Sequence, residues 1–135
     1  MDPLSFAAAV PGGPGAAAQA RRLVWSQLGS HVPTHLLGDV ALLVTELVAN
    51  GVRHGGAGPD DVLELRFEVR PPRLRVEVAD PGQRGEGGVG PRAADYRRGG
   101  GLGLQIVDQV AERWGTGDGP HTCVWFEMDV TRADS

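Results

Sequence analysis

Two neighbouring segments with alternating apolar and polar residues constrain the fold of this chain most strongly. Residues 62–69 read VLELRFEV and residues 74–80 read LRVEVAD, with only a short turn containing Pro-Pro between them. Alternation with a period of two is typical of a strand that buries one face. Strands joined by so short a turn pair antiparallel, because a parallel pair needs a long crossover. We therefore expect an α+β fold rather than a doubly wound one.

The remaining segments show helical and strand patterns in a definite order. Apolar residues recur every three or four positions in residues 16–29 and 35–54, which predicts two helices. We expect strands over 4–10 and 121–130 and a helix over 102–115. The predicted architecture is a two-layer α/β sandwich, with helices covering one face of a mixed, mostly antiparallel sheet. The helix over 35–54 has an apolar sector at about 100° per residue, formed by Val40, Leu43, Val44, Leu47 and Val48.

Composition excludes several classes of protein. The chain has 135 residues, which suits one domain over 1–135, and its net charge of −4 disfavours general binding to nucleic acid. All basic residues are arginine, so no lysine can bind phosphate or form a Schiff base. The single cysteine, Cys123, allows no internal disulfide, and we read no apolar run of about 20 residues, which predicts no membrane span. The amino terminus has no basic region of a signal peptide, so we expect a cytoplasmic protein without membrane association. We also expect Trp25, Trp114 and Trp125 to lie in the core.

Two polar residues interrupt the apolar helix over 35–54. Glu46 and Asn50 are four residues apart, so their side chains project side by side from one helix face. A glutamate can orient or deprotonate a hydroxyl group or water. An asparagine carbonyl suits Mg2+, which takes its other ligands from phosphate and water. A solvated helix flank with a terminal asparagine is the ordinary alternative for this pair.

Two further motifs suit a nucleotide. Asp80 ends an apolar strand and precedes Pro81-Gly82, where a carboxylate can accept a hydrogen bond from the exocyclic amine of adenine. Residues 99–104, GGGLGL, lead directly into a helix, whose first amides can bind polyphosphate. Arg97 and Arg98 stand just before them and could contact phosphate oxygens. A turn and a flexible linker are the ordinary alternatives.

Together and in this order, these motifs resemble the Bergerat-type ATP-binding fold of DNA gyrase, MutL and histidine kinases. The segments that carry the resemblance are ELVANGVRHGG (46–56), VEVADPG (76–82), RGGGLGLQIVDQVAERWG (98–115) and HTCVWFEM (121–128). The chain is most similar to the small stand-alone branch, the anti-sigma factor serine kinases of the RsbW and SpoIIAB type. The resemblance implies a glycine-rich ATP lid at about residues 81–101, a length at which loops are usually functional or disordered.

The resemblance also implies roles for individual residues. Glu46 would be the catalytic base, Asn50 would ligate Mg2+ between the phosphates of ATP or ADP, and Asp80 would bind the adenine amine. Gly82 would make room for the adenine ring, and Thr122 would support it through its hydroxyl group. The remaining expected ATP contacts are Arg53, His54, Arg97, Arg98, Gly99, Gly100, Gly101, Leu102, Gly103 and Leu104.

The chain departs from the family pattern in its lid and in one helix position. Arg84 stands where the D-x-G-x-G motif has its second glycine, and Gly51 replaces the alanine that usually follows the asparagine. The resemblance implies a homodimer whose partners are a sigma factor and a STAS-type antagonist, phosphorylated on serine. Two alternatives stay open: a nucleotide-responsive switch with little or no kinase activity, and an adaptor that has lost nucleotide binding.

Overall fold

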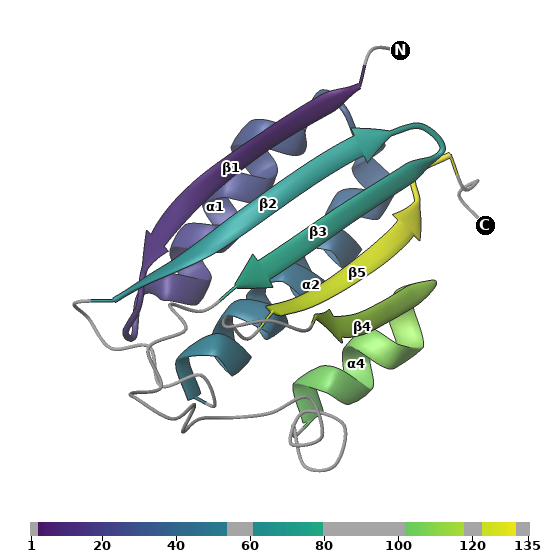
Figure 1. Ribbon diagram of the computed structural model, residues 1–135. Helices are drawn as coiled ribbons and strands as arrows, with labels where there is room; N and C mark the ends of the chain where they lie inside the picture. Colours follow the sequence, from purple (N-terminus) through teal and green to yellow (C-terminus); the bar gives the residue numbers. More distant parts are fainter. Residues whose placement is uncertain (1–2, 54–60, 80–101, 118–122, 132–135) are drawn as a thin grey trace.

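The structure, a computed structural model, describes residues 3–53, 61–79, 102–117 and 123–131. In this part of the chain, five strands form one sheet, and the helices lie together on one of its faces (Figure 1). In chain order the elements are β1 (Leu4–Pro11), α1 (Ala16–Leu28), α2 (Thr34–Arg53), β2 (Val62–Arg70), β3 (Arg73–Ala79), α4 (Leu102–Val110), β4 (Arg113–Gly117) and β5 (Cys123–Asp129).

The sheet has the strand order β1-β2-β3-β5-β4. The predicted hairpin is confirmed, because β2 and β3 pair antiparallel with Arg70 opposite Arg73. Every pairing between described strands is antiparallel, so the mixed character that we had allowed for the sheet is not found among them. The α+β, two-layer architecture is confirmed, and β1 and β4 form the two edges of the sheet.

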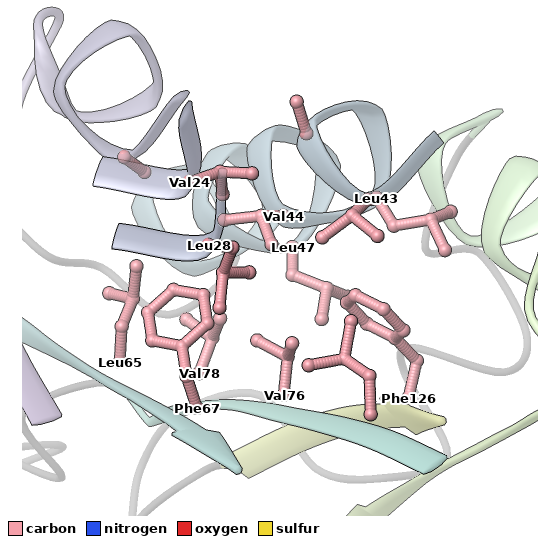
Figure 2. Close-up of a cluster of buried hydrophobic side chains, with 14 of the residues drawn as sticks. Val24, Leu28, Leu43, Val44, Leu47, Leu65, Phe67, Val76, Val78 and Phe126 are labelled. Atoms are coloured by element: carbon pink, nitrogen blue, oxygen red, sulfur yellow. The ribbon is translucent and has the colours of Figure 1, made fainter. Parts of the chain in front are cut away.

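The core lies between the helices and the sheet. The predicted apolar sector of α2 is fully buried, and α1 adds its own buried stripe, which includes Val24 and Leu28. In Figure 2 the labelled side chains of the two helices face Phe67 of β2, Val76 of β3 and Phe126 of β5. Because alternate strand residues point to opposite faces, the apolar half of each strand meets the helices. This packing holds α2 in place across the middle of the sheet.

The predicted helix over 102–115 is wrong at its carboxyl end. The helix α4 ends at Val110, and Arg113–Gly117 form the strand β4, paired antiparallel with β5. Trp114 continues the apolar spacing of the helix, but it lies opposite Phe126 in the sheet, and its Nε1 donates to Asp108 Oδ1 at 2.9 Å. Two glycines, Gly115 and Gly117, disfavour helix by about 1 kcal/mol each, which lets sheet pairing prevail.

The expectation that all three tryptophans lie in the core is also wrong. Trp25 is 42% exposed on α1. Trp125 lies on the sheet face opposite the helices, where the Arg75 guanidinium sits 4.3 Å from the centre of its ring. Tryptophan is amphipathic, so it can cover an outer surface as well as fill a core.

The helix α2 is long and apolar enough, by length and composition alone, to cross a membrane. The segment Thr34–Val52 spans 19 residues with a mean hydropathy of 1.3, a stretch that our inspection of the sequence overlooked. In the structure 56% of it is buried inside the domain. A helix buried on this scale is typical of a protein core, where the same composition occurs.

Candidate nucleotide-binding site

The helix α2 carries the two described side chains of the candidate site. Asn50 is completely buried, and Glu46, one turn earlier, is half-buried. The Asn50 Nδ2 atom donates a hydrogen bond to the Glu46 backbone carbonyl at 3.0 Å. The two residues therefore share one side of the helix, as their spacing predicts.

Asn50 is unusual because the other buried residues of α2 are all apolar. A buried amide is costly unless both its ends have partners. Since Nδ2 is committed to the backbone of its own helix, Oδ1 is directed away from that carbonyl. A carbonyl oxygen held in this way is the atom type that Mg2+ prefers in proteins.

Four chain segments with the expected motifs come together at one end of the domain. Figure 1 shows the carboxyl ends of α2 and β3 on the same side as the amino ends of α4 and β5. Ala79, the last residue of β3, pairs with Cys123, the first residue of β5. Asp80 and Thr122, the next residues in the sequence on either side of this pair, lie outside the described residues.

The helix α4 begins at Leu102, directly after the glycines of the expected lid, and it packs against α2. Its backbone start at Leu102, Gly103 and Leu104 agrees with the prediction that the glycine-rich motif opens a helix. The first amides of a helix have no partners within it and favour an anion. The structure thus sets a helix amino terminus beside the helix that holds Asn50.

Most of the other predicted site residues lie outside the described residues. These are His54, Asp80, Gly82, Arg97, Arg98, Gly99, Gly100, Gly101 and Thr122. Arg53 is the last residue of α2, where only its backbone is described. Their roles stay predictions, as do the lid over 81–101 and the ATP contacts within it.

Gly51, which departs from the family pattern, has a packing explanation. A Cβ atom at this position would lie 3.0 Å from Leu63 Cδ2 at the start of β2. The glycine lets the carboxyl end of α2 approach the sheet closely, directly beside Asn50. The residue therefore contributes to the position of the candidate site, although it weakens the helix by roughly 1 kcal/mol relative to alanine.

The described side chains fit a magnesium ion held mainly by a nucleotide. Among them, no group of three or more His, Cys, Asp or Glu residues could form a metal cage. Magnesium commonly binds through one or two protein oxygens and completes its shell with phosphate and water. Asn50 carries an amide oxygen, the kind of group that can be such a ligand, and Glu46 lies one helical turn away on α2.

Our inspection of the sequence missed two groups of polar residues elsewhere in the domain. Glu127 is only 9% exposed and lies beside three arginines on the open face of the sheet. Arg21 and Arg22 line a groove between α1 and α2. The alternating charged residues of the strands could have indicated the first group. No local pattern in the sequence indicates the groove beside Arg21 and Arg22, because its two walls come from different helices.

Comparison with known proteins identifies the family of this chain. No curated protein matches it. The family model described as histidine kinase-like ATPase domain matches residues 10–128, which cover most of the 135 residues. The match contains both helices of the α1–α2 pair, the complete hairpin and the segment around Asn50. The chain therefore belongs to the histidine kinase-like ATPase domain family.

Proposed function

We propose that this protein binds ATP with Mg2+ at the carboxyl end of α2 and uses it to phosphorylate a serine of an anti-sigma factor antagonist. The observation that carries the proposal is Asn50, a fully buried amide one turn after Glu46 in a domain of the histidine kinase-like ATPase family. In this family context, a buried polar residue at the carboxyl end of α2 supports a binding role for that end of the helix.

The chemistry assigns separate tasks to the two side chains. Asn50 Oδ1 binds Mg2+, which neutralises the charge of the phosphates. Glu46 is half-buried, so it can meet a serine hydroxyl group at the surface and accept its proton. The serine oxygen forms a bond to the γ-phosphorus, the bond from that phosphorus to the β,γ-bridging oxygen breaks, and ADP leaves with that electron pair.

The regulatory part of the proposal rests on the resemblance to stand-alone anti-sigma factor kinases. In this proposal the protein is a cytoplasmic homodimer that holds a sigma factor inactive. A STAS-type antagonist competes for it and is inactivated by phosphorylation. ATP and ADP would alter these affinities by ordering the segment over 81–101 around the nucleotide.

Isothermal titration with ATP and ADP, with and without Mg2+, tests the nucleotide site. We expect magnesium-dependent binding that Asn50→Ala weakens and Asp80→Asn nearly abolishes. Glu64→Gln, which changes an exposed residue of β2, is the matched control and leaves binding unchanged. Circular dichroism of each variant separates loss of the ligand site from loss of the fold. Absence of binding at millimolar nucleotide, with the fold intact, would refute ATP binding and favour the adaptor alternative.

Phosphoryl transfer to a purified antagonist, followed with radiolabelled ATP, tests the enzymatic step. Glu46→Gln should abolish transfer but keep most of the nucleotide affinity, because Asn50 and the phosphate contacts remain. Equal loss of binding and transfer would contradict the assigned role of Glu46. Nucleotide binding that changes antagonist affinity without any transfer would replace the kinase by the partner-switching alternative.

A further inference from the structure

A groove of about 1060 Å³ lies between α1 and α2 and is lined entirely by residues of these two helices. Neither Glu46 nor Asn50 lines it. The helices bury their apolar stripes against the sheet and against each other, so the groove belongs to their outer surface. Its walls include the small residues Ala17, Ala18 and Gly38, which let another chain approach the helix backbones closely.

Two large apolar side chains are exposed in this groove. Trp25 of α1 is 42% exposed and Leu42 of α2 is 40% exposed. Among the described residues only one other large apolar side chain, Val62, is exposed to this degree. Scattered apolar residues are normal on a surface, whereas Trp25 and Leu42 both line this one groove. Tryptophan in particular is enriched at the energetic centres of interfaces.

The charge of the groove is positive and unbalanced. Arg21 and Arg22 both line it, and no acidic residue does. Neither arginine forms an ion pair with a residue that the structure describes. The arginines of the strands behave differently, since each one pairs with a glutamate of the sheet: Arg66, Arg70, Arg73, Arg75 and Arg113. Two unpaired arginines beside exposed apolar side chains give the groove a positive charge that complements an anionic group.

We propose that this groove binds an acidic segment of a partner protein. A bulky apolar side chain of that segment packs between Trp25 and Leu42, and its carboxylates pair with Arg21 and Arg22. Arg21 lies one turn before Trp25, so the charged and the apolar contact fall on one ridge of α1. An acidic segment with one apolar side chain, docked between two helices, would cover the exposed apolar side chains and pair with the two arginines.

The docking surface does not depend on nucleotide binding, since its residues are separate from Asn50 and Glu46. The two are nevertheless close along α2. Gly38, Leu42 and Glu46 follow one another at intervals of four residues, so a segment docked at Leu42 lies one helical turn from the candidate catalytic carboxylate. Failure of the ATP experiments would leave the groove unaffected, and failure of docking would leave the nucleotide site unaffected.

Selection of short random peptides on phage against the immobilised full chain, without nucleotide, tests this proposal. We expect enriched peptides that combine aspartate or glutamate with leucine, phenylalanine or tryptophan. A synthetic peptide of the enriched sequence should shift backbone amide NMR signals of α1 and α2. Its affinity, measured by fluorescence polarisation, should fall about tenfold or more in Trp25→Ala. The Arg21→Ala/Arg22→Ala double variant should fall by about the same factor and lose most of the salt dependence.

The matched control is Arg66→Ala/Arg70→Ala, which removes the same charge from exposed positions of β2. It should change peptide affinity by less than about twofold. Equal loss in both double variants would reduce the effect to net charge and overturn a specific groove. Enrichment of basic or uncharged peptides, or no enrichment, would overturn it as well.

Two other possible occupants of the groove, a second copy of the chain and a lipid surface, would each give a different experimental result. If a second copy fills the groove, sedimentation equilibrium will show a dimer that Trp25→Glu converts to a monomer, and selected peptides will compete with dimerisation. If the groove binds lipid, the chain will sediment with phosphatidylserine vesicles and Arg21→Ala/Arg22→Ala will not. Either result would overturn the proposal of an acidic protein partner.

Discussion

The two faces of the sheet use the same strands in opposite ways. On the face toward the helices, side chains such as Phe67, Val76 and Phe126 are completely or almost completely buried (Figure 2). On the other face, residues one position away form arginine–glutamate pairs, of which Arg66–Glu64 and Arg70–Glu68 are largely exposed. The apolar face carries most of the stability, because burial of apolar area is worth far more than exposed ion pairs.

The side chains on the open face are not equally exposed, because Glu127 is largely shielded from solvent. Glu127 lies 3.3 Å from Arg73, 3.1 Å from Arg75 and 3.6 Å from Arg113, and its side chain is only 12% exposed. Burial lowers the pKa of Arg75, but hydrogen bonds and charges of Glu77 and Glu127 outweigh it and raise that pKa overall. Arg75 therefore keeps its positive charge beside Glu127.

Truncation in the buried face should have the largest effect. Phe126→Ala removes a ring that is fully buried between the sheet and the helices, and we expect the free energy of unfolding to fall by about 3–5 kcal/mol. Urea denaturation followed by circular dichroism measures the loss. Trp25→Ala removes an even larger side chain from an exposed position and should cost less than about 1 kcal/mol. Similar losses in the two variants would refute the assignment of stability to the buried face.

Neutralising Glu127 should have the next largest effect. Glu127→Gln keeps the shape of the side chain but leaves three arginines without their shared counter-charge, at a cost of about 1–3 kcal/mol. Glu64→Gln, in an exposed pair, should change the free energy of unfolding by less than about 0.5 kcal/mol. Urea denaturation of both variants, at low and at high salt, makes the comparison. A loss at Glu127 no larger than that at Glu64 would show that the open face is energetically uniform.

A methyl group at Gly115 should disturb the open face. A Cβ atom there would lie 2.9 Å from the ring of Trp125, which is also in contact with Arg75. Gly115→Ala should therefore displace the ring and destabilise the protein by about 1–2 kcal/mol, with a changed near-ultraviolet circular dichroism spectrum. As the control, Gly38→Ala meets nothing within 4 Å on α2 and should stabilise by about 0.5–1 kcal/mol. An unchanged spectrum in Gly115→Ala would contradict the close packing.

The smallest effect should come from the exposed pairs of β2. Glu68→Gln breaks the 3.2 Å contact with Arg70, whose side chain is 71% exposed, and should cost less than about 0.5 kcal/mol. A double-mutant cycle with Arg70→Ala isolates the coupling energy of the pair, which salt should reduce further. A coupling above about 1 kcal/mol would show that the open face contributes more than exposure predicts.

The regular patterns of the sequence predicted most of the fold. The apolar sector of α2 is buried as predicted, and the alternating hairpin pairs as predicted. The strand β4 could not be predicted, because its apolar residue Trp114 fits the spacing of the preceding helix equally well. The prediction for Trp25 was wrong for a different reason: Trp25 lies outside the buried stripe of α1 that includes Val24 and Leu28.

For the candidate site, too, only part of the sequence-based prediction can be compared with the structure. The spacing of Glu46 and Asn50 predicted a shared helix side, which the structure confirms, and the structure also shows that Asn50 is completely buried. The roles of Asp80 and of the glycine-rich segment stay predictions, because these residues lie outside the described ones.

The amino-acid sequence by itself determined the elements with a clear period, their order and the polar pair on α2, because these depend on residues near one another in the chain. The tertiary structure decided which elements meet. It placed β4 at the sheet edge, gathered three arginines around Glu127 and set Trp25 and Arg21 of one helix across a groove from Leu42 of another. Such contacts join residues far apart in sequence, and only the packing of helices on the sheet determines them.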